Sequence, residues 1–161
     1  SEKDALDHGV RWIKDVASRS DEISVNPMNI QRGTIIDRLH RHNEYRPPWL
    51  WSLVEMIKQA HPYICPKGGV NGSPDQICRL IIHPTAGGKI RGAHNCGSCD
   101  KFVVAAIERY AVSGDLREFE GLSCECQAIW QAELALESAL PIPLGISQPR
   151  RGNRVENLRS L

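Results

Sequence analysis

The chain has 161 residues, of which 41% are hydrophobic and 24% are charged, and its net charge is +1. These proportions are typical of one folded domain, and they exclude a disordered chain and a strongly basic, histone-like binder. No apolar run reaches the ~20 residues that a membrane helix needs, and the first residues do not resemble a signal peptide. The sequence therefore predicts a soluble intracellular protein, cytoplasmic or nuclear, with a single helical domain over residues 1–140.

Three helices are predicted in the first part of the chain, because apolar residues recur there at helical spacing. They span residues 2–18, 28–43 and 48–60. Trp49 and Trp51 stand at the start of the third helix. They would either pack in the core or anchor an exposed protein-interaction surface.

Residues 62–99 differ in kind from the helices, since they hold seven glycines and four prolines. One apolar run, 77–83, is either a short strand or one buried helical turn. A loop-rich stretch of this length inside a domain needs some other source of stability than a core. Three of the six cysteines lie inside it and Cys99 closes it, so a bound metal is the natural staple.

Helical spacing returns over 100–113 and 124–140, with one short helical turn expected at 115–120. In the last helix, Ile129, Ala132 and Leu136 share one apolar face, which we expect to be buried. Residues 141–161 carry four arginines and one glutamate. We predict that they form a basic arm that orders on a partner. The predicted fold is mainly α, with about five helices around an irregular, zinc-stapled insert rich in Gly, Pro and Cys.

The strongest chemical pattern is a Cys-Gly-Ser-Cys turn followed later by Cys-Glu-Cys. A Cys-x-x-Cys turn lets two thiolates reach one ion, and each cysteine pair lies where a helix should begin, which favours the thiolate form. The cofactor predicted from this donor set is zinc. The predicted ligands are Cys96, Cys99, Cys124, Cys126 and His94.

Geometry leaves two alternatives for the residues that supply the second pair of ligands. A straight helix over 100–113 separates its two ends by ~20 Å. The two cysteine pairs then meet only if the segment 114–122 runs back nearly extended, and a helical turn at 115–120 would make this return too short. In that case the remaining ligands would come from another set: Cys65, Cys78, His61 or His83.

Residues 108–119, then Leu122 and Ser123 and a helix to Leu140, resemble a helix-turn-helix. The type is that of sigma-factor region four and of phage late-gene regulators of the antiterminator kind, and the likeness covers about thirty residues. It implies that the last helix enters the DNA major groove, where Gln127 and Gln131 would face the bases.

The predicted function is that of a small zinc-binding regulator associated with nucleic acid, a transcription regulator without catalytic activity. Its partners would be nucleic acid, a transcription complex, or both. The predicted contacts to nucleic acid are Lys89, Arg91, Lys101, Arg117, Gln127, Gln131, Arg150, Arg151 and Arg154. One alternative is a protein-interaction module, such as a viral or host accessory factor. A second is a thiol–disulfide oxidoreductase that uses the Cys-Gly-Ser-Cys turn.

Overall fold

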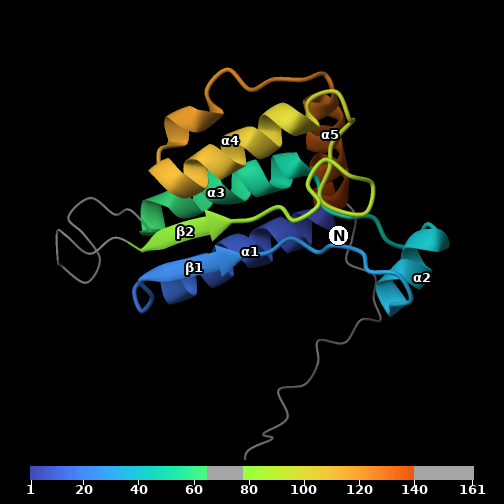
Figure 1. The fold of residues 1–161 in the computed structure, drawn as a ribbon, viewed down its shortest axis with the longest axis horizontal. Helices are drawn as coiled ribbons and strands as arrows, with labels where there is room; N and C mark the ends of the chain where they lie inside the picture. The colour runs from blue at the N-terminus through green and yellow to red at the C-terminus, as the bar shows by residue number, and fades with distance from the viewer. Residues whose placement is uncertain (65–77, 140–161) are drawn as a thin grey trace, which may run out of the picture.

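The computed structural model describes residues 1–64 and 78–139 (Figure 1). The elements over these residues are α1 (Glu2–Ala17), β1 (Glu22–Val25), α2 (Ile35–Arg41), α3 (Leu50–Ile64), β2 (Arg79–Ile82), α4 (Asp100–Ser113), the 3-10 helix η1 (Leu116–Phe119) and α5 (Cys126–Ala139). The mainly α prediction with five helices is confirmed. The predicted arm 141–161, with Arg150, Arg151 and Arg154, lies outside the described residues, as does Cys65. None of the described helices has the length and hydropathy of a membrane span.

Helix α3 is the centre of the core, and α1 and α4 pack on it (Figure 1). Leu50, Ile57 and Ala60 of α3 are 0% exposed, and Leu6 and Ile13 of α1 are buried as well. Helix α1 starts where it was predicted, because the Ser1 hydroxyl oxygen accepts a hydrogen bond from the Asp4 N–H. Helix α3 runs four residues beyond its predicted end, through Pro62, and its last residue, Ile64, is 1% exposed and packs in the core.

The two strands β1 and β2 pair in parallel, with Glu22 opposite Arg79 and Val25 opposite Ile82. Strand β2 resolves the alternative for residues 77–83 in favour of a strand. Strand β1 was not predicted, since its alternation of polar and apolar residues covers only four positions. Both strands run toward the end of the molecule at which α2 lies (Figure 1).

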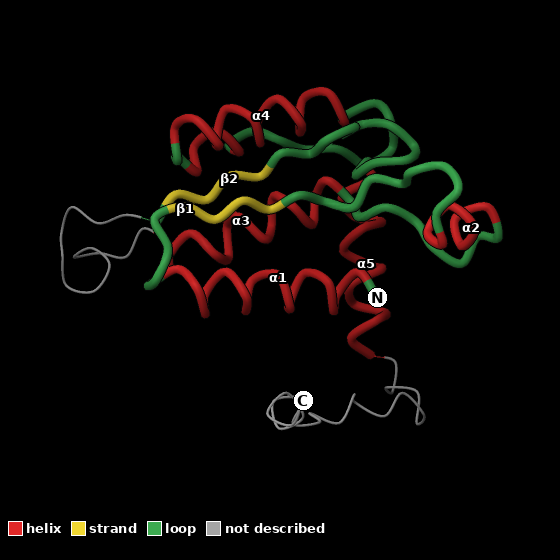
Figure 2. The backbone as a smooth tube through the Cα atoms, turned by 60° about the horizontal axis from the view of Figure 1, so that its bottom comes forward, coloured by secondary structure: helices red, strands yellow, loops and turns green. Residues whose placement is uncertain are grey.

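Helix α2 projects from this end of the molecule, away from the other helices (Figure 1 and Figure 2). It is shorter than predicted and begins after Thr34, whose hydroxyl oxygen accepts a hydrogen bond from the Asp37 N–H. The side chain of Asp37 is buried and joins α2 to the loop after β2 through an ion pair with Arg91, Oδ1 to Nη2, at 2.6 Å. Backbone contacts reinforce the junction, since the Ile30 N–H donates to the Arg91 carbonyl at 2.8 Å. The Asp37 carboxylate is therefore a main tie between α2 and the rest of the described chain.

Acidification should loosen α2. The Gly33 N–H and the Arg91 guanidinium both hold the pKa of Asp37 below its ordinary value of 3.8. A lowered pKa means that the stabilisation is complete above pH 3.8 and is lost as the pH falls through the folded-state pKa. We expect the α2 amide signals in NMR spectra to lose their native positions below about pH 4, while core signals persist longer.

The matched control is Asp37→Asn, which keeps the size of the side chain but removes its charge. In this variant α2 should already be loosened at neutral pH. Its amide signals should then show no further change as the pH falls below about 4. An unchanged acid response in Asp37→Asn would show that another group holds α2.

Candidate metal centre

Four sulfur atoms meet at one point, and they belong to Cys96, Cys99, Cys124 and Cys126. All four Sγ atoms lie within 4.8 Å of one another. The Sγ–Sγ distances are 3.9 Å for Cys96–Cys99, 3.6 Å for Cys96–Cys124 and 3.6 Å for Cys99–Cys126. A tetrahedral zinc with Zn–S bonds of about 2.3 Å requires sulfur atoms about 3.8 Å apart. The cluster therefore has the dimensions of a site for one metal ion.

Two loops that precede helices carry the cysteines. The first pair lies just before and at the N-cap of α4, and the second pair lies at the start of α5. In the first loop, Gly97 adopts φ +90°, a conformation that side chains rarely tolerate. The Asp100 carboxylate fixes this loop by accepting hydrogen bonds from the N–H groups of Asn95, at 3.0 Å, and Gly97, at 3.1 Å.

The expectation that a helical turn at 115–120 would keep the two pairs apart is wrong. The turn exists as η1, yet the second pair still reaches the first. A 3-10 helix of four residues covers about 8 Å at 2.0 Å per residue. The other five residues between Gly114 and Cys124 are not helical and cover about 17 Å at 3.3 Å per residue. Together the two parts are long enough to bring Cys124 back along α4 to the first cysteine pair.

The thiols differ in their tendency to lose a proton. The N–H groups of Cys99 and Ser98 lower the pKa of the exposed Cys96 thiol to about 6. Burial raises the pKa of Cys99, and it raises the pKa of Cys126 to about 12. Thiols buried side by side resist ionisation without a cation, whereas a bound divalent ion would bind them as thiolates.

Two further side chains donate hydrogen bonds to the cluster. The indole Nε1–H of Trp51, on α3, donates to the Cys126 sulfur at 3.3 Å, and the Asn95 amide donates to the Cys99 sulfur at 3.3 Å. Such bonds orient metal ligands and offset part of their negative charge. Neither contact was predicted from the sequence. For Asn95 a signal exists, since it directly precedes the Cys-x-x-Cys turn.

Replacing Gly97 by alanine tests this loop. The added methyl group meets no atom within 4 Å, so its effect comes from the left-handed backbone, at about 1–2 kcal/mol. We expect Gly97→Ala to lower both the stability and the metal affinity. Gly114→Ala is the matched control, since Gly114 has φ +67° and equally open surroundings at the far end of α4. This control should lose a similar amount of stability in thermal unfolding but retain its metal under the same chelator challenge.

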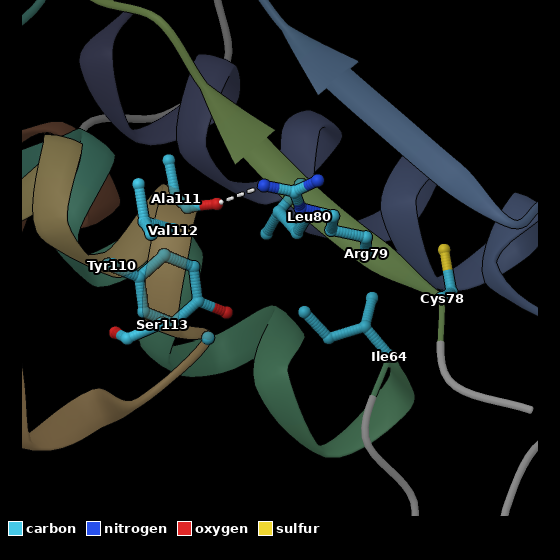
Figure 3. Close-up of a pocket in the computed structure, with 9 residues that line it drawn as sticks. Ile64, Cys78, Arg79, Leu80, Tyr110, Ala111, Val112 and Ser113 are labelled. Atoms are coloured by element: carbon cyan, nitrogen blue, oxygen red, sulfur yellow. Dashed lines mark hydrogen bonds between the residues drawn. The ribbon is translucent and has the colours of Figure 1, made fainter. Parts of the chain in front are cut away.

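The other candidate ligands that the structure describes lie outside the cluster. His94 is not in the cluster, and its Nδ1 is 2.8 Å from the Gly92 carbonyl oxygen. His61 contacts the Tyr110 hydroxyl at 3.3 Å, and His83 is exposed. Cys78 lies at the start of β2, beside a cavity of about 290 Å³ (Figure 3).

The predicted nucleic-acid contacts are spread over several surfaces. Lys89 and Lys101 are exposed, and Lys101 lies over the ring of Phe102. Arg91 is placed in the ion pair that holds α2, and Arg117 pairs with Asp115 at 2.5 Å. Gln131 is exposed and Gln127 half-buried.

Trp49 and Trp51 are 8% and 3% exposed. They belong to the core and do not form an exposed surface.

Comparison with known proteins finds similarity to archaeal proteins. The chain is 32% identical over 140 residues to a protein of Methanosarcina acetivorans named archaeosine synthase subunit beta, which covers 85% of this chain and 36% of the relative. It is 33% identical over 132 residues to the protein of the same name from Thermococcus kodakarensis, over 81% of this chain and 37% of the relative. An uncharacterised protein of Methanocaldococcus jannaschii is 32% identical over 126 residues, which is 76% of this chain and 31% of that protein. The chain thus spans about a third of the length of these relatives. No family model and no solved structure matches it.

These relatives overturn the helix-turn-helix resemblance, because they are named as subunits of a synthase and not as sigma factors or phage regulators. The structure supplies the physical reason. The inner face of α5 is buried in the core through Cys126 and Trp130, and Cys126 belongs to the sulfur cluster. The base-reading role of Gln127 and Gln131 rested on that resemblance and loses its argument with it.

The predicted function is corrected as well. The names of the relatives contradict a DNA-binding transcription regulator and a transcription complex as its partner. They equally give no support to a viral or host accessory module or to a thiol–disulfide oxidoreductase. The prediction of a protein without catalytic activity is at odds with relatives that are named as synthase subunits. The relatives are archaeal, so they do not support a nuclear location.

Proposed function

We propose that this chain is part of an archaeosine synthase subunit and acts in the modification of tRNA, where archaeosine occurs. The observation that carries the proposal is the similarity to the Methanosarcina acetivorans subunit, which runs through 85% of the chain. Because the chain spans about a third of that relative, the synthase activity, the tRNA substrate and the other subunit of the complex are all part of the proposal.

Within such a subunit, we propose that the four cysteines hold one zinc ion. The donor set supports zinc, since four thiolates at tetrahedral spacing are the ligands that structural zinc prefers. Sulfur atoms within 4.8 Å of one another leave room for a single ion rather than for a cluster of several irons. With all four positions taken by protein, no place remains for water or substrate, so the role is structural. The ion would tie the starts of α4 and α5 to each other and, through Trp51, to α3.

The test is the archaeosine content of tRNA, measured by nucleoside mass spectrometry. Deleting the gene that encodes this chain should abolish archaeosine in bulk tRNA, and the unchanged gene should restore it. A gene with Cys126→Ser should restore it poorly, because the zinc-bound fold would be lost. Normal archaeosine in the deletion strain would overturn the proposal.

A further inference from the structure

Three features of the α2 surface stand out from the rest of the described chain: its position, its charge and its shape. The α2 surface is here the outer side of residues 32–44. None of its residues belongs to the sulfur cluster or to the nucleic-acid contacts predicted from the sequence. Its charge and its shape point to the same kind of ligand.

Its position is the end at which both parallel strands finish. Strand β1 leads into the segment before α2, and strand β2 leads into the loop that carries Arg91, the partner of Asp37. Helix α2 therefore lies beyond the carboxyl ends of both strands (Figure 1).

The α2 surface carries three arginines, Arg32, Arg38 and Arg41, against two acids, so its net charge is positive. Arg32 and Arg38 are exposed, and among the described residues neither side chain has an ion pair or a hydrogen bond. Asp37, the acidic group on the same helix, is buried and already engaged with Arg91 and Arg41. Glu44 is exposed and lines the same hollow as Arg38. The unpaired guanidinium groups are thus available to an anionic ligand.

Its shape includes a hollow of about 320 Å³ with an apolar part and a polar part. The residues that line it are Ile35, Arg38, Leu39, His42 and Glu44. Ile35 is 79% exposed, the second-highest value among the large hydrophobic side chains of the described chain. The Arg38 guanidinium beside Ile35 and Leu39 suits an unstacked base, because RNA-binding proteins stack such bases on arginine as well as on aromatic rings.

We propose that the α2 surface binds RNA, with Arg32 and Arg38 contacting phosphates and the hollow receiving one base. This inference rests on the proposed function, since it assigns that function a surface for its RNA. The buried Asp37–Arg91 pair then has a clear purpose, because it holds the RNA-contacting helix in position.

The test uses the native protein with any subunit that co-purifies, and its probe is an in vitro transcribed tRNA followed by fluorescence anisotropy. We expect Arg32→Gln/Arg38→Gln to weaken binding at least about tenfold and to reduce the slope of log K against log salt by about 1.5 to 2. The matched control is Arg11→Gln/Lys58→Gln, which removes two exposed positive charges from α1 and α3 and should change neither quantity appreciably. Thermal unfolding of both variants should match the unaltered protein, because all four side chains are exposed.

Three outcomes would overturn the inference. If the unaltered protein binds the transcript and the α2 variant binds it equally well, RNA contacts another surface, and the proposed function stands. If the variant binds RNA normally but no longer retains a co-purifying subunit, the α2 surface is a protein interface. If the unaltered protein does not bind the transcript, the inference fails, and the archaeosine measurement decides separately whether the proposed function fails with it.

Discussion

Cys126→Ser should release the metal and destabilise the protein by about 4 kcal/mol or more, the largest effect we expect from any single substitution. The Cys126 sulfur lies 3.6 Å from that of Cys99 and accepts the Trp51 indole N–H, so it links α5 to both α4 and α3. Loss of a metal ligand belongs to the few mechanisms that exceed the usual range of point mutations. The free energy of metal binding is also free energy of folding, so a strong chelator should have the same effect on the unaltered protein.

The measurement is thermal unfolding with and without chelator, together with the zinc content of each sample. Cys78→Ala is the matched control, since Cys78 is 1% exposed but lies outside the cluster. It should cost about 1 kcal/mol and leave the zinc in place. The cluster does not stabilise the fold if Cys126→Ser unfolds like the unaltered protein. The same conclusion follows if chelator leaves the melting temperature of the unaltered protein unchanged.

Trp130→Ala should cost about 3–5 kcal/mol and lower the melting temperature by roughly 10 °C. Trp130 is 5% exposed and lies one turn after Cys126 on the inner face of α5. Its indole N–H donates to the Ser52 hydroxyl at 2.8 Å, and that hydroxyl in turn donates to the Glu2 carboxylate. The substitution therefore opens a cavity and also breaks the polar chain that joins α5 to α3 and α1.

Ile129→Ala is the control for this second prediction. Ile129 is 63% exposed, so its truncation should change stability by no more than about 0.5 kcal/mol. Unfolding of the two variants by denaturant, read by tryptophan fluorescence and by circular dichroism, gives the comparison. Equal losses in both variants would mean that α5 packs through a different face from the one described.

The same pair of residues shows where sequence reasoning reaches its limit. The spacing of Ile129, Ala132 and Leu136 predicted the buried face of the last helix, yet Ile129 and Leu136 are exposed. Helix α5 instead turns Cys126 and Trp130 inward, because the sulfur cluster fixes its first turn and the Ser52 hydroxyl accepts from the indole. Apolar periodicity ranks faces by hydrophobicity alone and gives no weight to such partners.

Features that depend on residues close together in the sequence, in contrast, were predicted. Helix α4 spans the predicted residues, because Gly114 at φ +67° ends it and an apolar stripe runs along it. Strand β1 escaped prediction, since its only partner, β2, lies more than fifty residues later. The cysteines of the cluster were predicted by residue type, but whether the second pair could reach the first depended on the path of residues 114–125. Trp51 could not be predicted as a partner of Cys126, because the contact joins α3 to α5.

The most direct test of the central claim, a single structural metal held by four cysteines, is elemental analysis of the purified native protein with a count of its reactive thiols. We expect one zinc per chain, and we expect four of the six thiols to stay protected until the protein is denatured. It also predicts that zinc is absent from Cys126→Ser and retained in Cys78→Ala. A metal-free native protein whose Cys96 and Cys99 react at once, with no loss of stability, would contradict it.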